Sequence, residues 1–320
     1  MNRDARIYVA GGNTLLGAAL IERLQTDGCR NLVGLPPDQP DLTVSGQVED
    51  FFGEARPEFV FLAAGQSGGI GRNQAQPAAL MLDNLLSASH VIHAAHTHDV
   101  CKLLYVGSAC CYPRDAPQPM RIESLMTGPL EQTNAAYATA KLAGLQLCAA
   151  YRRQCGARFI TAIPANPFGP HDDFSEEGGH VIPALLRRTH EAKQRSDSEL
   201  TVWGTGTPRR EFIPAPDLAD ACMFVMQHYE EAEPINLGGG MDLSIAELAQ
   251  VIADVVGFRG RIRFDATKPD GMLRKVLDST PLRALGWRPA TNFRTALAET
   301  YAWFLQHEVK EDAGHERAVV

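Results

Sequence analysis

The first strand of the chain runs directly into a glycine turn, and this turn restricts the fold more than any other stretch. Residues 6–10 (Arg-Ile-Tyr-Val-Ala) are predicted to form a short strand, and residues 11–17 (Gly-Gly-Asn-Thr-Leu-Leu-Gly) lead from it into a helix that ends near Gln25. A glycine turn at a helix N-terminus lets backbone N–H groups approach a pyrophosphate, which the helix dipole also favours. The chain therefore starts with a βα unit that is typical of dinucleotide-binding folds.

Further apolar strands alternate with helices after this unit. Strands are predicted at residues 31–35, 59–64, 102–106 and 158–164, with a long helix from about Pro77 to His98. This alternation predicts an α/β fold with a Rossmann-type doubly wound parallel sheet. Beyond residue 165 the alternation weakens, which predicts a smaller C-terminal α/β region.

Composition narrows the classes of partner. The 320 residues include 45% hydrophobic and 21% charged side chains and carry a net charge of -8. This acidic balance argues against nucleic acid or an anionic membrane surface as a partner. No apolar run reaches membrane-spanning length, and no segment near Met1 has the pattern of a signal peptide. Seven cysteines without CxxC spacing predict reduced thiols in the cytoplasm, with no disulfide framework and no metal site.

One helix carries a pair of residues with a clear chemical use. Tyr137 and Lys141 are four residues apart, so they project from the same face of a helix. An ammonium beside a phenol favours the phenolate, and such a tyrosine can exchange a proton with a carbonyl oxygen while hydride moves at the carbon. Ser108 comes just after the apolar run 102–106, which places its hydroxyl at the carboxyl end of a strand, where open α/β sheets carry their chemistry.

The loop after the second strand is informative about the coenzyme. Cofactors with a 2′-phosphate usually meet an arginine there, whereas NAD usually meets a carboxylate. From Asn31 through Glu54 the chain has no Lys or Arg, and Asp38 and Asp41 are its nearest acids. Neither standard signature is clean here. Repulsion by Asp38 would slightly disfavour a phosphate, which leaves NAD(H) open, while Arg30 or a residue distant in the sequence could still contribute a cation.

The second half of the chain combines an aromatic ring with clustered arginines. Trp203 ends a predicted strand, Arg209 and Arg210 come shortly after it, and Arg188 lies on a predicted amphipathic helix. A ring can stack on a base and arginines can bind a diphosphate, as a nucleotide sugar requires. The alternative is an exposed arginine cluster in salt bridges.

Polar residues also predict where later helices begin. Ser244 is expected to cap a helix over 245–256, and Asp217 a helix over 218–227. The last helix is expected over about 293–306, with a frayed charged tail beyond it.

Together these motifs resemble the extended short-chain dehydrogenase/reductase superfamily, and within it most closely the GDP-L-fucose synthase family. The resemblance covers nearly the whole chain. Its most specific segments begin at His180 (His-Val-Ile-Pro-Ala-Leu-Leu-Arg-Arg) and at Lys268 (Lys-Pro-Asp-Gly). The other matching segments are 107–113, 137–141, 166–174, 203–208, 210–212 and 274–275.

The resemblance implies epimerisation at C3 and C5, and nicotinamide-dependent reduction at C4, of a GDP-4-keto-6-deoxy-mannose-type sugar nucleotide, giving GDP-L-fucose or a close relative. It assigns the base and the acid of the epimerisation to Cys110 and His180, whose side chains titrate in a suitable range. It makes Tyr137 the proton donor at C4, with Lys141 lowering its pKa and Ser108 holding the carbonyl oxygen.

The resemblance also implies two sets of ligand contacts. The residues expected to bind the cofactor are Gly11, Asn13, Thr14, Leu15, Leu16, Gly17, Ala63, Ala64, Tyr137, Lys141, Pro164, Asn166 and His180. The residues expected to bind the substrate are Asn166, Arg188, Trp203, Arg210 and Lys275.

The chain departs from the family pattern around the cofactor. Asn13 and Thr14 stand where the family usually has Arg and Gly, and the arginine expected after the second strand is absent. The resemblance to the family implies NADP(H), whereas these departures leave NAD(H) open. They also leave open a non-reductive NAD-dependent GDP-sugar 3,5-epimerase, and a nucleotide-binding regulator without activity is a third hypothesis. Cys111, beside Cys110, is interpreted as a packing residue.

The resemblance completes the expected organisation. Residues 1–165, with parts of 205–240, are assigned to a dinucleotide-binding Rossmann domain, 166–310 mainly to nucleotide-sugar binding, and 311–320 to a tail. A homodimer is expected, because small residues on the Tyr137 helix would allow a second subunit to approach closely. These residues are Ala136, Ala140, Ala143 and Gly144.

Overall fold

The computed structural model describes residues 1–175, 179–268 and 270–317. Its strands are β1 (Arg6–Ala10), β2 (Asn31–Val33), β3 (Phe59–Leu62), β4 (Lys102–Val106), β5 (Phe159–Pro164), β6 (Asn166–Phe168), β7 (Glu199–Trp203), β8 (Arg209–Pro214), β9 (Ile235–Leu237), β10 (Asp242–Ser244), β11 (Arg261–Asp265) and β12 (Arg274–Lys275). The α-helices are α1 (Leu15–Thr26), α2 (Ser45–Ala55), α3 (Ile70–Ala75), α4 (Pro77–Thr97), α5 (Ala135–Cys155), α6 (Val181–Gln194), α7 (Ala215–His228), α8 (Ile245–Val256), α9 (Thr280–Ala284) and α10 (Phe293–Arg317). The 3-10 helices are η1 (Ala109–Cys111), η2 (Ile122–Ser124) and η3 (Gln132–Asn134).

Six parallel strands form the main sheet, in the order β2-β1-β3-β4-β5-β9. Every residue of β4 and β5 is buried, as expected for parallel strands that are covered on both faces. The chain leaves β1 for the edge strand β2 and then returns across β1 to β3. The strand order therefore reverses between β1 and β3, and ligands of open α/β sheets bind at such a reversal.

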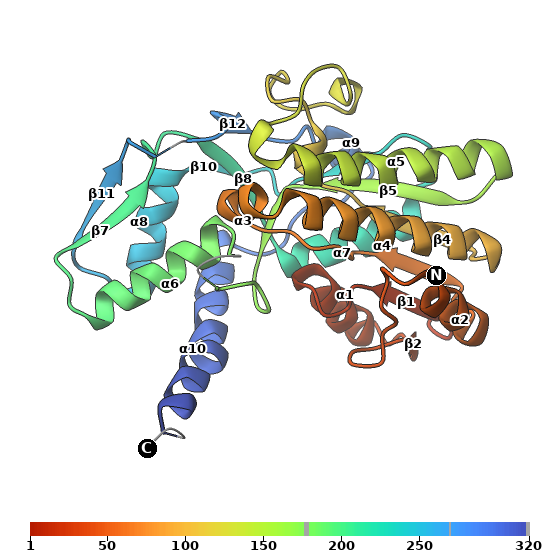
Figure 1. Cartoon of the computed structure of the whole chain (residues 1–320), viewed down its shortest axis with the longest axis horizontal. Coiled ribbons are helices and arrows are strands. Elements are labelled where there is room, and N and C mark those ends of the chain that lie inside the picture. Colours follow the sequence, from red (N-terminus) through yellow and green to blue (C-terminus); the bar gives the residue numbers. More distant parts are fainter. Residues whose placement is uncertain (176–178, 269, 318–320) are drawn as a thin grey trace.

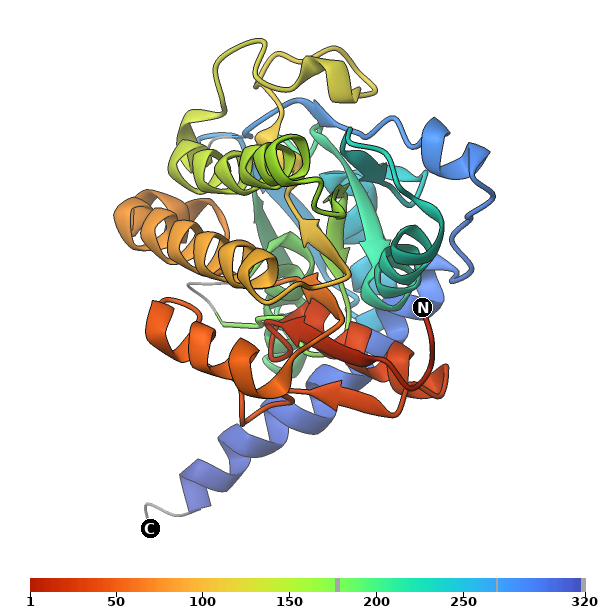
Figure 2. The same ribbon diagram turned by 90° about the vertical axis from the view of Figure 1, so that its right-hand side faces the viewer.

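Helices cover both faces of this sheet (Figures 1 and 2). α4 packs against α2 and α5 on one face, and α1 packs against α7 on the other. The chain therefore has the predicted fold class, a Rossmann-type doubly wound parallel sheet. Because α7 and β9 come late in the chain, the main sheet is completed only after the chain has passed through the second region.

The second region is built around two smaller sheets at the other end of the molecule (Figure 1). β8 is central to one of them, with β10 antiparallel on one side, β12 parallel on the other and β6 paired to its C-terminal half. β7 and β11 form the other sheet. Helix α8 packs against both α6 and α10 in this region.

Each region has its own hydrophobic core. The larger core contains Tyr8, Phe61 and Ile160 among many buried residues of the main sheet and its helices. The smaller core includes Leu186 and Ile252. Three buried side chains of the larger core come from the segment that was expected in the second region, namely Leu277, Leu282 and Trp287. The assignment of cofactor and sugar-nucleotide binding to the two regions stays a prediction.

The helix boundaries show which local signals were interpreted correctly. Ser244 caps α8 as predicted, with a reciprocal capping box formed with Glu247. The prediction for Asp217 is wrong: α7 begins at Ala215 with a proline in its first turn, where the fixed φ of proline suits a helix start. Asp217 instead accepts a 2.7 Å hydrogen bond from the Thr291 hydroxyl.

The C-terminal helix is longer than predicted. α10 continues to Arg317 rather than ending near residue 306, so most of the expected tail at 311–320 is helical. Residues 318–320 lie outside the described residues, as does Pro269 from the segment that begins at Lys268.

Candidate active site

A large cleft of about 2350 Å³ lies where the two regions meet. One wall comes from the turn after β1 and the loops after β3 and β4, and the other from α6, β7, β8 and β12. Every predicted catalytic, cofactor-binding and substrate-binding residue except Gly17 lines this cleft. The structure therefore gathers residues that are far apart in the sequence around one space.

The glycine turn after β1 forms one end of the cleft. Gly11 has a φ of +87°, and a Cβ there would come within 2.6 Å of the Ala64 Cα, so the two backbone segments meet closely. Thr14 caps α1, accepting a hydrogen bond from the Gly17 N–H at 3.1 Å. A side chain at Gly17 would overlap the Gly11 carbonyl oxygen. Gly17 thus serves the packing of the turn and lies away from the cleft surface.

A residue that the sequence reasoning missed covers this turn. The Gln39 side chain accepts a 3.2 Å hydrogen bond from the Gly12 N–H and donates one of 3.1 Å to the Val9 carbonyl. The neighbouring Asp41 accepts hydrogen bonds from the Thr43 N–H and hydroxyl. The loop after β2 therefore presents amides and a carboxylate to the cleft.

Ser108 and Tyr137 form a hydroxyl pair beside the end of β4. Ser108 caps η1, accepting a 3.2 Å hydrogen bond from the Cys110 N–H, and its hydroxyl also bonds the Tyr137 side chain. Burial raises the pKa of Tyr137. The sequence had suggested that Lys141 would lower the pKa of this phenol, but in this structure desolvation is the largest effect on that pKa and raises it.

Lys141 is almost fully buried beneath Tyr137. Its ammonium donates a 3.0 Å hydrogen bond to the Ala64 carbonyl and lies 6.0 Å from the centre of the Tyr137 ring. Burial lowers the pKa of Lys141 to about 8. The hydrogen bond therefore joins α5 to the loop that follows β3.

Cys110 is held by two nitrogen donors. Lys275 donates to its sulfur from 3.1 Å, and the Asn134 amide donates from 3.2 Å. Burial would raise the pKa of Cys110, but Lys275, Ser108 and Arg210 together bring it below its ordinary value.

The adjacent cysteine is chemically different. Cys111 is fully buried and contacts the Ala138 carbonyl. Burial raises the pKa of Cys111 to about 12, so its thiol stays protonated. This agrees with the interpretation of Cys111 as a packing residue.

His180 stands at the start of α6 and faces the opposite wall. Its Nε2 lies 3.2 Å from the Ser67 hydroxyl, in the loop after β3. Burial lowers the pKa of His180, against an opposing effect of Asp173. The imidazole is therefore mainly neutral near pH 7.

The loop that carries Ser67 is fixed by polar side chains of α3 and α4. Asp83 accepts a 2.9 Å hydrogen bond from the Gln66 N–H, and the Asn84 amide donates to the Gln66 carbonyl at 2.8 Å. Arg72 donates to the Ser67 carbonyl at 3.0 Å. These contacts set the position from which Ser67 meets His180.

The predicted substrate residues lie on the second wall. Asn166 donates a 2.7 Å hydrogen bond to the Glu211 carbonyl, which positions its amide at the start of β6. Arg188 donates to the Thr201 carbonyl, joining α6 to β7. The Trp203 ring is 63% exposed, with the Lys268 ammonium 5.2 Å from its centre. An exposed ring in a cleft can stack on a planar ligand.

Comparison with known proteins places the chain in a family. Residues 7–238 match the model of the NAD dependent epimerase/dehydratase family. GDP-L-fucose synthase 1 of Arabidopsis thaliana is 46% identical over 306 residues, which cover 96% of this chain and 95% of that protein. The chain belongs to the GDP-L-fucose synthase family. It is an enzyme of that family, with a nicotinamide cofactor as the family description implies.

Two solved structures are similar to this chain over nearly its whole length. A GDP-6-OMe-4-keto-L-xylo-heptose reductase from C. jejuni superimposes with a TM-score of 0.90 at 33% identity, covering 96% of this chain and 99% of that one. A GDP-L-fucose synthetase from Naegleria fowleri bound to NADP has a TM-score of 0.89 at 30% identity, covering 96% and 95%.

Two further findings concern metals and membranes. Within residues 1–175, 179–268 and 270–317, no cluster of His, Cys, Asp or Glu is suited to hold a metal ion. In the same part of the chain, no helix combines the length and the apolar character needed to cross a membrane.

Proposed function

We propose that the protein inverts C3 and C5 of a GDP-4-keto-6-deoxy-mannose-type sugar nucleotide and then reduces C4, giving GDP-L-fucose or a close relative. The observation that carries this proposal is that two groups of side chains with different chemistry line the same cleft. Cys110 and His180 are suited to move protons at carbon, while Ser108, Tyr137 and Lys141 are suited to ketone reduction.

The epimerisation needs a base and an acid. A C4 ketone acidifies the hydrogens on its neighbouring carbons. The Cys110 thiolate takes one such proton, so the C–H bond breaks, an S–H bond forms and the electron pair moves to the carbonyl oxygen as an enolate. His180 in its protonated form returns a proton to the other side of the carbon. Cys110 then loses its proton to solvent and His180 takes one up, after which a second exchange at the other carbon inverts both centres.

The residues present fit a nicotinamide dinucleotide. The glycine turn and the α1 N-terminus suit a pyrophosphate, and the small residues Ala63 and Ala64 leave room beside them. When bound and reduced, the cofactor supplies the hydride for C4. Ser108 then holds the C4 oxygen and Tyr137 donates its phenolic proton to that oxygen. Lys141 compensates the phenolate that is left behind.

The choice of coenzyme depends on the end of the cleft near β2. The family relative from Naegleria fowleri binds NADP, and the resemblance implied NADP(H). This chain instead offers Asn13, Gln39 and Asp41 there, with no Lys or Arg from residue 31 to 54. A 2′-phosphate needs a cation to offset its desolvation. We therefore propose that this chain prefers NAD(H).

Nicotinamide absorbance tests the function and the coenzyme together. The purified protein is incubated with GDP-4-keto-6-deoxymannose and either NADH or NADPH. Stoichiometric oxidation, faster with NADH, is the expected result. Oxidation with NADPH alone would overturn the coenzyme assignment. An Asn13→Arg variant should shift the ratio of the two affinities toward NADPH by about tenfold or more, the effect of one charge-assisted hydrogen bond.

A non-reductive GDP-sugar 3,5-epimerase is the second candidate, favoured by the same lack of cations near β2. Such an enzyme would consume no coenzyme. Deuterium uptake at C3 or C5 in heavy water, without oxidation of either coenzyme, would support it against the reductive reaction. If neither deuterium uptake nor coenzyme oxidation were observed, both candidates would be excluded.

We also propose a cytoplasmic homodimer. All seven cysteines are free thiols, as expected in a reducing compartment. α4 and α5 pack against each other, and they expose Leu82 and Ala143 respectively. The other small residues contribute less than expected, because Ala140 is buried and Gly144 packs on the chain's own Tyr105. Light scattering after size exclusion should give twice the chain mass, and a monomer would contradict the proposal.

A further inference from the structure

The sulfur of Cys110 is bound by a lysine that lies 165 residues away in the sequence. The Lys275 side chain is only 8% exposed, and its ammonium donates a 3.1 Å hydrogen bond to Cys110. In the described part of the chain, Lys275 forms no ion pair with a carboxylate. The resemblance implied a substrate contact for Lys275, but the structure directs it at the thiol.

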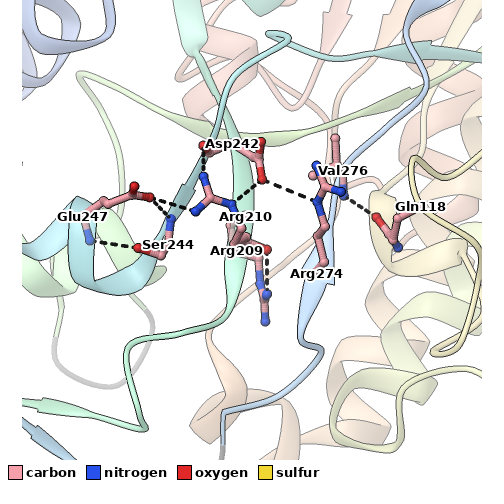
Figure 3. Close-up of polar contacts among 8 residues, drawn as sticks. All are labelled: Gln118, Arg209, Arg210, Asp242, Ser244, Glu247, Arg274 and Val276. Atoms are coloured by element: carbon pink, nitrogen blue, oxygen red, sulfur yellow. Dashed lines mark hydrogen bonds and ion pairs between the residues drawn. The ribbon is translucent and has the colours of Figure 1, made fainter.

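Strand geometry explains why this lysine faces the cleft. β12 pairs with β8 so that Arg274 lies opposite Arg209, and Lys275 opposite Arg210. Successive residues of a strand point to opposite faces. Arg210 and Lys275 line the cleft, whereas Arg209 and Arg274 bind Asp242 on the other face, as Figure 3 shows.

A second donor completes the surroundings of the sulfur. Asn134, the last residue of η3, donates its amide to the sulfur from 3.2 Å. Two N–H donors from separate elements therefore converge on one atom. A thiolate accepts such hydrogen bonds far better than a thiol does, since charge-assisted bonds are roughly twice as strong as neutral ones.

We propose that Lys275, together with Asn134, holds the Cys110 sulfur as a thiolate, so that Lys275 acts on the base of the epimerisation instead of on the diphosphate. The charged and titratable groups around the sulfur agree with this role. Lys275 and Arg210 face it from β12 and β8, and Ser108 and Tyr137 present neutral hydroxyls from the N-cap of η1 and from α5. The two cations together lower the pKa of Cys110.

The role of Lys275 in the reaction rests on the proposed function, whereas the thiolate itself does not. When Cys110 takes a proton from carbon, the sulfur becomes a neutral thiol and Lys275 keeps all its protons. The thiol must return its proton to solvent before it can act at the next carbon. The nearby ammonium favours this return, because it stabilises the thiolate electrostatically. Lys275 is in this sense a positioning residue.

Alkylation of Cys110 in the ligand-free protein tests the proposal without turnover. Iodoacetamide reacts with the thiolate, forming an S–C bond and releasing iodide, and peptide mass spectrometry monitors Cys110 separately from the other cysteines. Lys275→Ala should shift the pH profile of this rate upward by about one unit or more, which slows alkylation near pH 7 by about tenfold or more. Lys275→Arg should keep most of the wild-type rate.

The adjacent Arg274→Ala is the matched control. It removes one positive charge from the same strand, but on the face that binds Asp242, so the alkylation profile should stay at its wild-type position. If Lys275→Ala does not fold, Asn134→Asp replaces it, because a carboxylate against the sulfur should raise the thiol pKa and slow alkylation by a similar factor.

Unchanged alkylation profiles in Lys275→Ala and Asn134→Asp would overturn the proposal. Calorimetric titration with GDP tests the alternative that Lys275 binds the diphosphate. Weaker GDP binding by Lys275→Ala, with an unchanged alkylation profile, would assign Lys275 to that role. A shifted profile in a protein that turns over no GDP-sugar would remove the proposed function but leave the thiolate in place.

Discussion

Two residues at the centre of the cleft should separate the two halves of the reaction. Tyr137 shares a side-chain hydrogen bond with Ser108, and in the proposed reaction it donates a proton only when C4 is reduced. Tyr137→Phe should therefore slow reduction by about 10²-fold to 10⁴-fold, the usual contribution of a general acid. It should leave solvent deuterium uptake at C3 and C5 close to the wild-type rate. Nuclear magnetic resonance in heavy water and coenzyme absorbance measure the two steps in one sample.

Cys110→Ser provides the opposite result, because a serine hydroxyl is a far weaker base than a thiolate. Deuterium uptake should fall first, and reduction should fall only as far as it depends on prior epimerisation. Equal losses of both steps in Tyr137→Phe would contradict the assigned roles.

A second residue-scale prediction concerns the energetic cost of the buried Lys141. Its pKa falls from 10.5 to about 8, which corresponds to about 3 kcal/mol of destabilisation at pH 7. The hydrogen bond to Ala64 offsets about 1 kcal/mol. Lys141→Met should thus stabilise the protein by about 2 kcal/mol at pH 7 while reduction is lost, as urea unfolding and coenzyme absorbance would measure.

The pH dependence of this difference has a definite sign. Between pH 8 and pH 10.5 the unfolded lysine binds more proton than the folded one, so wild-type stability from this group rises with pH. The advantage of Lys141→Met should shrink across that range. Lys102→Met is the control: burial also lowers the pKa of that ammonium, but it binds two carbonyls and Glu230, so its loss should destabilise. A stability gain in both variants would contradict the argument.

At the scale of elements, the turn between β1 and α1 leaves no room for a side chain at Gly17, a residue of α1. A Cβ at Gly17 would overlap the Gly11 carbonyl, whereas a Cβ at Gly46, near the start of α2, would meet open space. Gly17→Ala should lower the unfolding free energy by several kcal/mol, of the order found for overpacked cores. Gly46→Ala should raise it by up to about 1 kcal/mol through helix propensity. Chemical unfolding of both variants measures this contrast.

The elements also show how far sequence reasoning reached. The glycine turn, the strand runs and the Ser244 cap are local signals, and the structure confirms the elements they predicted. Gln39 and Asn134 escaped notice because each acts through a contact with a distant segment, and neither carries a local motif. The Lys275 contact depends on the register of β12 against β8, which spacing along the chain does not encode.

The pKa of Tyr137 was misjudged for a related reason. The four-residue spacing correctly placed Lys141 on the same helix face, but the extent of burial is a tertiary property. Desolvation raises the pKa of the phenol, and the group that opposes it is the Ser108 hydroxyl, while the Lys141 cation lies 6.0 Å from the ring centre.

At the scale of the whole molecule, the two regions are interleaved in sequence. The main sheet receives β9 on the outer side of β5, and its α1 face receives α7, both after the chain has built β6 to β8. A fragment of residues 1–165 would therefore leave a buried strand and one helical face uncovered. It should fail to fold cooperatively and should bind no coenzyme, as circular dichroism and coenzyme fluorescence would measure. A fragment with a sharp unfolding transition would contradict this expectation.

Two of the hydrogen bonds that join the walls of the cleft are made by reactive side chains. Ser67 meets His180, and Cys110 meets Lys275. In the proposed reaction, the distance between the walls and the protonation of the acid and the base are therefore expected to change together. Substitutions elsewhere that move the two walls apart should therefore alter the rate of proton transfer more readily than the affinity for the nucleotide. In a homologue or an engineered variant, the pH profile of the reaction rate would then be a more sensitive measure of cleft opening than nucleotide affinity.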